Sequence, residues 1–218
     1  MHKITIFIVG NSNYNSDIDM ILIIFEIISF QSHKSPIFVA SKLHSMALIK
    51  RVRGLEPVTG KNCYLADNAT IIGDVVIGDD CSIWFNTVLR GDVNSIRIGN
   101  KVNIQDGTVL HCLYQRSVVE IGNNVSIGHN VVVHGAKIAD NVLIGMGAII
   151  LDNAVIGENS IIAAGALILA DTIVEPGSIW GGVPAKFIKK VDPQQNREMI
   201  ERIADNYLMY AGWFSSEE

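Results

Sequence analysis

Residues 121–144 read IGNNVS-IGHNVV-VHGAK-IADNVL-I, with an aliphatic residue opening each unit of a repeat. The same six-residue period extends on both sides of this stretch. Its first positions are Leu65, Ile71, Ile77, Ile83, Leu89, Ile98, Ile104, Leu110, Ile121, Ile127, Val133, Ile138, Ile144, Ile150, Ile156, Ile162, Ile168, Val174 and Trp180. Such a period is typical of a parallel β-helix, in which about three hexads complete one coil and first-position side chains stack inside it. We therefore predict a mainly β fold, a parallel β-helix of hexapeptide repeats.

The repeat is irregular at three places. The spacing between first positions rises to nine residues after Leu89 and to eleven after Leu110, and it falls to five after Val133. We interpret the first two as insertions and expect the second to form a small loop. The turns need residues that tolerate unusual backbone angles. We expect these to be Gly73, Gly78, Gly99, Gly122, Gly128, Gly145 and Gly157.

Composition limits the possible functions. The chain has 218 residues, of which 49% are hydrophobic and 18% are charged, so it can bury a core and we expect one domain with appendages. Its formal net charge of -5 disfavours nucleic acid as a partner, and no basic run suggests a membrane surface. The chain has three cysteines, an odd number, and their spacing is not that of a metal site: Cys63, Cys81 and Cys112. We expect reduced thiols, no disulfide framework and a cytoplasmic protein.

The chain divides into three segments on this pattern. Residues 1–45 lie outside the repeat, and their apolar run at residues 18–30 contains two acidic residues and is too short to span a bilayer. We expect this segment to be a dispensable or weakly ordered extension, with Met46 as the natural start of the domain. Residues 46–190 are predicted to form the β-helix domain.

Residues 191–218 are predicted to form a C-terminal α-helix that packs on the β-helix. Asp192 suits the N-cap, Pro193 the first helical position and Gln195 the partner position of a capping box. An apolar stripe at three- and four-residue steps follows, formed by Ile200, Ile203, Tyr207, Tyr210 or Ala211, and Phe214. This stripe should fold back along a β-helix face and cover an exposed flank.

The repeat also predicts which polar residues lie together. If the insertions are ignored, Leu89, Leu110 and Val133 are three hexads apart, so the residues that follow them stack on one edge of successive coils. These residues are Arg90, His111 and His134, with neighbouring coils roughly 5 Å apart. By the same count, Gln105 and His129 lie on a different edge.

Three histidines on two edges favour a metal site shared between chains. His111 and His134 can hold a metal but leave coordination positions open, and His129 is poorly placed to fill one within its own chain. In a threefold-symmetric trimer, one edge of each coil meets a different edge of its neighbour, so His129 can reach across. Three imidazoles with an open fourth position are the catalytic zinc pattern. The alternative is that these are ordinary surface or interface histidines bonded to turn carbonyls.

Several motifs together resemble the gamma-class carbonic anhydrase family over residues 46–214. They are Arg90-Gly91-Asp92, Asn103-Ile104-Gln105-Asp106-Gly107, His111, His129, His134 and the Gly-Val-Pro-Ala sequence at residues 182–185. The resemblance implies left-handed coils assembled as a homotrimer. It also implies zinc, or iron(II) or cobalt(II) in its place, bound by His111 and His134 of one subunit and His129 of another.

On that resemblance, the expected reaction is hydration of carbon dioxide to bicarbonate by a metal-bound hydroxide at the subunit interface. Gln105 would orient the nucleophile or the substrate, and Asn103 would act near the carbon dioxide position. Tyr207 would correspond to an active-site tyrosine of the family. An ion pair across the subunit boundary is expected from Arg90 and Asp92, with Asp106 as a further partner.

One departure from the family keeps other functions open. Some members carry proton-shuttle glutamates just after the Arg-Gly-Asp motif and in an acidic loop, whereas here Val93 follows Asp92 and residues 112–119 contain no carboxylate. Proton transfer would then need water or buffer. A hexapeptide acyltransferase, which needs one histidine as a general base, is an alternative. A noncatalytic metal-binding trimer and a thioesterase-like hydrolase are the others.

Overall fold

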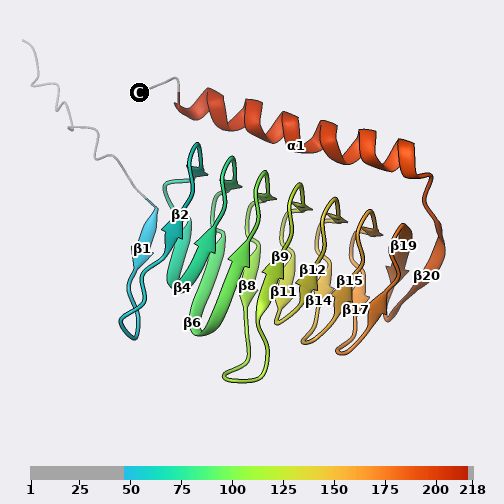
Figure 1. The fold of residues 1–218 in the computed structure, drawn as a ribbon, viewed down its shortest axis with the longest axis horizontal. Helices are drawn as coiled ribbons and strands as arrows, with labels where there is room; N and C mark the ends of the chain where they lie inside the picture. Colours follow the sequence, from blue (N-terminus) through green and yellow to red (C-terminus); the bar gives the residue numbers. More distant parts are fainter. Residues whose placement is uncertain (1–46, 216–218) are drawn as a thin grey trace, which may run out of the picture. The chain divides into compact units, whose positions relative to one another are not determined.

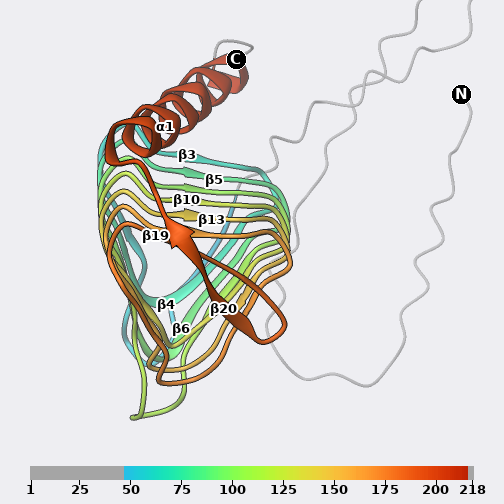
Figure 2. The same ribbon diagram turned by 90° about the vertical axis from the view of Figure 1, so that its right-hand side faces the viewer.

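A computed structural model describes residues 47–215, which lie in one compact unit. These residues wind into a parallel β-helix followed by one C-terminal helix, so the predicted mainly β fold is confirmed (Figure 1). Seen along the coil axis, each coil has three faces that meet at three corners (Figure 2). The predicted extension, residues 1–45, lies outside the described residues.

The first face of the coil is an eight-stranded sheet. Its strands are β3 (Tyr64–Leu65), β5 (Ser82–Ile83), β7 (Asn103–Ile104), β10 (Ser126–Ile127), β13 (Leu143–Ile144), β16 (Ile161–Ile162), β19 (Ser178–Gly182) and β20 (Ala185–Lys190). All pair in parallel except β20, which runs antiparallel to β19. The sequence does not predict this final hairpin, because β20 follows the last hexad and its residues do not carry the six-residue period.

The second and third faces form one continuous 12-stranded sheet. The second face contains β1 (Leu48–Lys50), β8 (Val109–His111), β11 (Val132–His134), β14 (Ile149–Ile150) and β17 (Leu167–Ile168). The third contains β2 (Val58–Thr59), β9 (Val119–Ile121), β12 (Lys137–Ile138), β15 (Val155–Ile156) and β18 (Ile173–Val174). The long strands β4 (Thr70–Ile77) and β6 (Val88–Ile98) bend at the corner between these faces and contribute to both.

The interior is the column of first-position aliphatic residues that the repeat predicts. Ile104 pairs with Ile127, and Ile127 pairs with Ile144 on the next coil. Every first-position side chain from Ile71 to Val174 is exposed by 5% or less. Because burial of one such side chain contributes about 1.5–3 kcal/mol, this column is the main source of stability of the coil.

The structure corrects the expected role of the glycines. Of the seven glycines named above, only Gly73 has a positive φ, at 73°. The corners are turned mostly by Asn and Asp residues in the left-handed conformation, such as Asn130 with a φ of 56°. The other glycines permit close approach between coils, because a Cβ at Gly128 would lie 2.7 Å from the backbone nitrogen of Met146. Coil spacing, rather than backbone conformation, requires glycine there.

Each irregularity of the repeat changes one corner between the second and third faces. The first insertion lengthens β6, whose register with β4 shifts after Gly73. The second insertion forms the loop of residues 112–118, which projects beyond β8 in Figure 1. A hydrogen bond joins the two ends of this loop, in which the Leu113 amide donates to Ser117 Oγ at 2.9 Å. The missing residue falls at Gly135, whose φ is 64°. All three irregularities therefore lie beside the predicted edge of Arg90, His111 and His134.

Helix α1 (Pro193–Ser215) packs along the first face near β5 and β10. Asp192 Oδ1 accepts the amide of Gln194 at 3.0 Å, which confirms the predicted N-cap, whereas the side chain of Gln195 lies outside the described residues. Of the predicted stripe, Ile200 and Ala211 are buried and Phe214 is exposed, and Ala204 is buried in addition. Among residues 47–215, no helix combines the length and the apolarity that crossing a bilayer requires.

Candidate metal centre

The structure brings His111 and His134 together at the corner that follows the second face. Each is the last residue of its strand, and the two are directly paired in the register of β8 and β11. Their ring centroids are 5.2 Å apart, and Nδ1 of His111 lies 3.2 Å from Nε2 of His134. The stacking predicted by counting hexads is therefore present within one chain.

A carboxylate holds the remaining nitrogen of each ring. His111 Nε2 lies 3.1 Å from Asp92 Oδ1, and His134 Nδ1 lies 2.9 Å from Asp152 Oδ2. Arg90 Nη1 in turn donates to Asp92 Oδ2 at 2.6 Å. We call Arg90, Asp92, His111, His134 and Asp152 the two-histidine cluster. A carboxylate behind an imidazole fixes the ring orientation and tautomer, as it does for histidine ligands of metals.

The charge states in the two-histidine cluster follow from burial and these contacts. Burial, and after it the positive charge of Arg90, lower the pKa of His111, which favours the neutral ring that a metal ligand must have. Burial acts to raise the pKa of Asp92, but the hydrogen bonds with Arg90 and His111 outweigh it and the pKa is lowered. The pKa of Asp152 is lowered in the same way, because hydrogen bonds from Ser117 and His134 outweigh burial.

Asp152 and Ser117 are functional candidates that sequence reasoning missed. Ser117 donates its hydroxyl to Asp152 Oδ1 at 2.6 Å, so the inserted loop supports the carboxylate that holds His134. Gly135 leaves the room for this contact, because a Cβ there would overlap both Ser117 Oγ and Asp152 Oδ1. One signal was available in the sequence. Ile150 stacks on Val133 one coil earlier, so Asp152, two residues after Ile150, lies at the corner that holds His134.

His129 lies at the corner between the first and second faces, after β10. Its Nδ1 is 2.8 Å from Asp106 Oδ2, so this ring also has a carboxylate behind it. Asn103 and Gln105 are buried on the preceding coil, where Gln105 Nε2 donates to Asn103 Oδ1 at 3.0 Å and Asn103 Nδ2 donates to Ser126 Oγ at 2.7 Å. We call Asn103, Gln105, Asp106, His129 and Tyr207 the His129 cluster.

Tyr207 reaches the His129 cluster from α1. Its ring packs edge-on against Trp84 with centroids 5.4 Å apart, and it lines a narrow crevice with Asn103. Burial, and after it the negative charge of Asp106, raise the pKa of Tyr207 to about 12. The phenol therefore stays protonated near neutral pH and can donate a hydrogen bond.

The ion pairs of the single chain differ from the expected set. Arg90 pairs with Asp92 of its own chain, and Asp106 pairs with His129. Pairing across a subunit boundary stays a prediction.

The two clusters have the donor chemistry of a divided zinc site. If each ring N–H donates to its carboxylate, the facing nitrogens of His111 and His134 are both lone-pair donors, and only a shared proton or cation stabilises two lone pairs 3.2 Å apart. Two nitrogens bound to tetrahedral zinc at 2.0–2.1 Å are about 3.3 Å apart, so the spacing fits. Within residues 47–215 of one chain, no three His, Cys, Asp or Glu side chains converge on one point.

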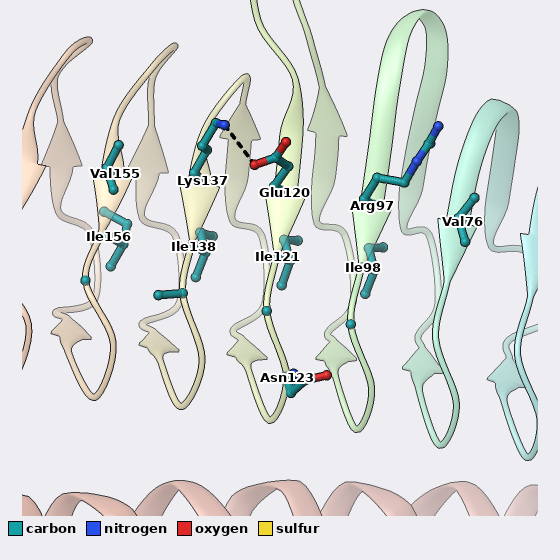
Figure 3. Close-up of a pocket in the computed structure, with 14 residues that line it drawn as sticks. Val76, Arg97, Ile98, Glu120, Ile121, Asn123, Lys137, Ile138, Val155 and Ile156 are labelled. Carbon is teal, nitrogen blue, oxygen red and sulfur yellow. Dashed lines mark ion pairs between the residues drawn. The ribbon is translucent and has the colours of Figure 1, made fainter.

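A groove on the third face lies away from both clusters. It runs over exposed parts of Val76 and Val155 and is crossed by the ion pair between Lys137 Nζ and Glu120 Oε2 at 2.9 Å (Figure 3). Its lining includes Ile121 and Ile138, whose side chains are nearly buried in the coil. None of the residues that line this groove is a histidine, so the groove belongs to neither cluster.

Sequence comparison relates the chain to known proteins. A family model described as bacterial transferase hexapeptide (six repeats) matches residues 56–91 and 135–170. A carbonic anhydrase of Geobacillus kaustophilus is 47% identical over 161 residues, which cover 74% of this chain and 87% of that protein. Gamma carbonic anhydrase 2, mitochondrial, of Arabidopsis thaliana is 40% identical over 166 residues. That match covers 74% of this chain but 59% of the Arabidopsis protein, so the chain spans less than two thirds of its length.

Structural comparison agrees on the fold. The structure of a hexapeptide transferase family protein from Anaplasma phagocytophilum matches with a TM-score of 0.71 and 38% identity, covering 77% of this chain and 98% of that chain. The structural comparison therefore shows the hexapeptide-repeat fold, and the sequence relatives show the family. With 47% identity across 87% of a carbonic anhydrase, and with gamma carbonic anhydrases among its relatives, the chain belongs to the gamma carbonic anhydrase family of hexapeptide-repeat proteins.

Proposed function

We propose that this carbonic anhydrase-like protein hydrates carbon dioxide to bicarbonate at a metal held between two copies of the chain in a threefold-symmetric trimer. His111 and His134 of one copy and His129 of the next would hold the metal. Zinc suits three imidazoles best, and iron(II) or cobalt(II) can take the same donors.

One observation carries this proposal. The two facing nitrogens of His111 and His134 are directed at each other by carboxylates on the far side of each ring, at 3.1 Å and 2.9 Å. A surface histidine that only bonds a turn carbonyl needs no carboxylate behind it. His129 has the same arrangement with Asp106, so each of the three histidines among residues 47–215 has a carboxylate behind its ring, as histidine ligands of metals commonly do.

The surrounding residues have separate tasks. When bound, zinc acidifies a water ligand so that hydroxide is available near neutral pH, an effect for which carbonic anhydrases are the standard example. Gln105 is held by Asn103 and would orient the nucleophile or carbon dioxide. Tyr207 keeps its proton, because burial raises its pKa to about 12, and would donate a hydrogen bond to a substrate oxygen.

The loop of residues 112–118 carries no carboxylate, so the proton released by hydration would leave through water or buffer. We therefore expect turnover to depend on the concentration of an imidazole-type buffer.

The test combines metal analysis with a carbon dioxide hydration assay on anaerobically purified protein loaded with zinc, iron(II) or cobalt(II). We expect about one metal per chain, since each interface of a cyclic trimer holds one site, and hydration that chelation abolishes. Full metal loading without hydration would contradict the enzyme assignment and favour a noncatalytic metal-binding trimer or a thioesterase-like hydrolase. Failure to bind metal would favour the hexapeptide acyltransferase.

Asp152→Asn tests the support behind His134. The amide keeps the shape of the carboxylate but loses its charge, so it no longer fixes the His134 tautomer, and we expect zinc affinity to fall roughly 10- to 100-fold. The measurement is competition with a fluorescent zinc chelator. Asp171→Asn is the matched control, because Asp171 also lies on a corner but its side chain accepts from Asn153 Nδ2 at 3.2 Å instead of holding a histidine, so the change should leave affinity unchanged. Equal affinities for the two variants would show that Asp152 does not position the ligand.

A further inference from the structure

Two cysteines occupy equivalent places on the first two coils. Cys63 immediately precedes β3 and Cys81 immediately precedes β5, and the strands pair so that Tyr64 lies opposite Ser82. The amide of Tyr64 donates to the carbonyl of Cys81 at 2.9 Å, which continues the parallel ladder to the cysteines. On the next coil the equivalent position holds Val102, so the thiol column ends after Cys81.

The two thiols point in the same direction. Cys63 Sγ donates to the carbonyl of Gly78 at 3.1 Å, and Cys81 Sγ donates to the carbonyl of Gly99 at 3.1 Å. Gly78 and Gly99 follow the paired residues Ile77 and Ile98, so these acceptors are also one coil apart. Parallel strands lie about 4.8 Å apart, which is within the Cα separation of roughly 4.4–6.8 Å that a disulfide spans. Both thiols are free in the structure.

Access to the pair is one-sided. Cys63 is partly exposed, whereas Cys81 is 1% exposed. A small groove between the first coils and α1 reaches both residues and is also lined by Tyr64, Leu208 and Gly212. Because Cys63 is the more exposed of the two, a dissolved reagent meets Cys63 first.

The chemistry of the two sulfurs is also unequal. The neighbouring Cys81 side chain lowers the pKa of Cys63 to about 7, although burial and the charges of Asp79 and Asp80 oppose this. The neighbouring Cys63, and after it burial, raise the pKa of Cys81. Burial raises the pKa of Cys112 to about 11, so neither Cys112 nor Cys81 is expected to attack a dissolved disulfide first at neutral pH.

We propose that Cys63 and Cys81 form a reversible thiol–disulfide site that exchanges with a low-molecular-weight disulfide of the glutathione class. The Cys63 thiolate attacks one sulfur of the small disulfide, its S–S bond breaks, and one small thiol leaves while a mixed disulfide remains on Cys63. Cys81 then loses its proton to water and attacks Cys63 Sγ, which releases the second small thiol and closes the Cys63–Cys81 bond. Two protein thiols are oxidised and one small disulfide is reduced to two thiols.

The closed bond would join the first two coils, at the N-terminal end of the β-helix and beside the C-terminal half of α1. Terminal coils of a solenoid have a neighbour on one side only, so they are the part of the fold where an added crosslink has most effect. Among residues 47–215 the third cysteine, Cys112, is buried in a later corner, where Sγ donates to the carbonyl of Ser95 at 3.5 Å, and it takes no part.

The experiment exposes the full chain, purified in reduced form, to a series of reduced and oxidised glutathione mixtures. Remaining thiols are trapped with iodoacetamide and the peptides are mapped by mass spectrometry. We expect the wild-type chain to lose two of its three thiols and to yield a peptide crosslinked between Cys63 and Cys81, and dithiothreitol to restore all three. Thermal unfolding of the crosslinked chain should occur at a higher temperature than that of the reduced chain.

Three variants separate the roles. Cys81→Ala should stop at the mixed disulfide of Cys63 with glutathione, Cys63→Ala should leave Cys81 unmodified, and Cys112→Ala should behave as the wild type. Crosslinks to Cys112 or between chains would overturn the proposal, as would modification of Cys81 in folded Cys63→Ala protein. Absence of the crosslink at a large excess of oxidised glutathione would also overturn it, and this result needs no substituted protein.

Discussion

His129→Ala protein should purify as an intact β-helix that contains essentially no zinc. His129 lies at a corner outside the hydrophobic interior, its side chain is 37% exposed and its ion pair is with Asp106, so its removal leaves the stacked aliphatic column unchanged. The remaining two histidines supply too few donors for tight zinc binding. Circular dichroism should match the wild type while the zinc content measured by mass spectrometry falls from about one per chain to a background level.

Lys137→Ala is a suitable control for the effect of any surface truncation. Lys137 pairs with Glu120 on the third face and belongs to neither cluster, so this variant should keep its zinc. A zinc content near one per chain in His129→Ala protein would mean that His129 is not a ligand. Loss of zinc in both variants would point to general destabilisation of the trimer instead.

Gly135→Ala should destabilise both the fold and the two-histidine cluster. Gly135 has a φ of 64°, a conformation that costs an L-residue about 1–2 kcal/mol, and the added Cβ would overlap the Ser117 hydroxyl and the Asp152 carboxylate. Displacing this hydrogen-bonded pair adds about 1–3 kcal/mol. We expect the free energy of unfolding, measured by urea denaturation, to fall by the sum of these two contributions. Zinc affinity should fall as well, because Asp152 no longer fixes the ring of His134.

The chain offers a matched control for the backbone cost. Gly147 has a φ of 67° and a Cβ there meets no atom within 4 Å, so Gly147→Ala contributes only the conformational strain. The difference between the two variants isolates the overlap with Ser117 and Asp152. Equal destabilisation of the two proteins would mean that the site accommodates the methyl group and that Gly135 has no special part in it.

Much of the site was predictable because a β-helix converts sequence distance into position. Once the insertions after Leu89 and Leu110 are ignored, equal places in the hexads stack, and this alone predicted that His111 and His134 would pair and that His129 would lie on another corner. The interior was predictable for the same reason, since every coil repeats the same environment at its first position.

The residues that hold the histidines were harder to predict, because they come from places where the repeat fails. Ser117 belongs to the inserted loop, whose path is set by its own hydrogen bond to Leu113, and Asp152 points back toward a shortened corner at Gly135. Periodicity carries no information about Ser117, and for Asp152 it indicates only that Ile150 stacks on Val133 one coil earlier. The prediction that glycines turn the corners was wrong for a related reason. Asn130 and the equivalent residues adopt the left-handed conformation at the corners, whereas most of the glycines lie where neighbouring coils approach closely.

The most direct test of the central claim is complementation between two inactive chains. Co-expressed and separately tagged His129→Ala and His134→Ala proteins should form mixed trimers, and each mixed trimer should contain one interface with a complete site, His134 coming from one chain and His129 from the other. At equal amounts, random assembly predicts recovery of about a quarter of the wild-type zinc content and hydration rate. No recovery in verified mixed trimers would contradict a metal site divided between chains.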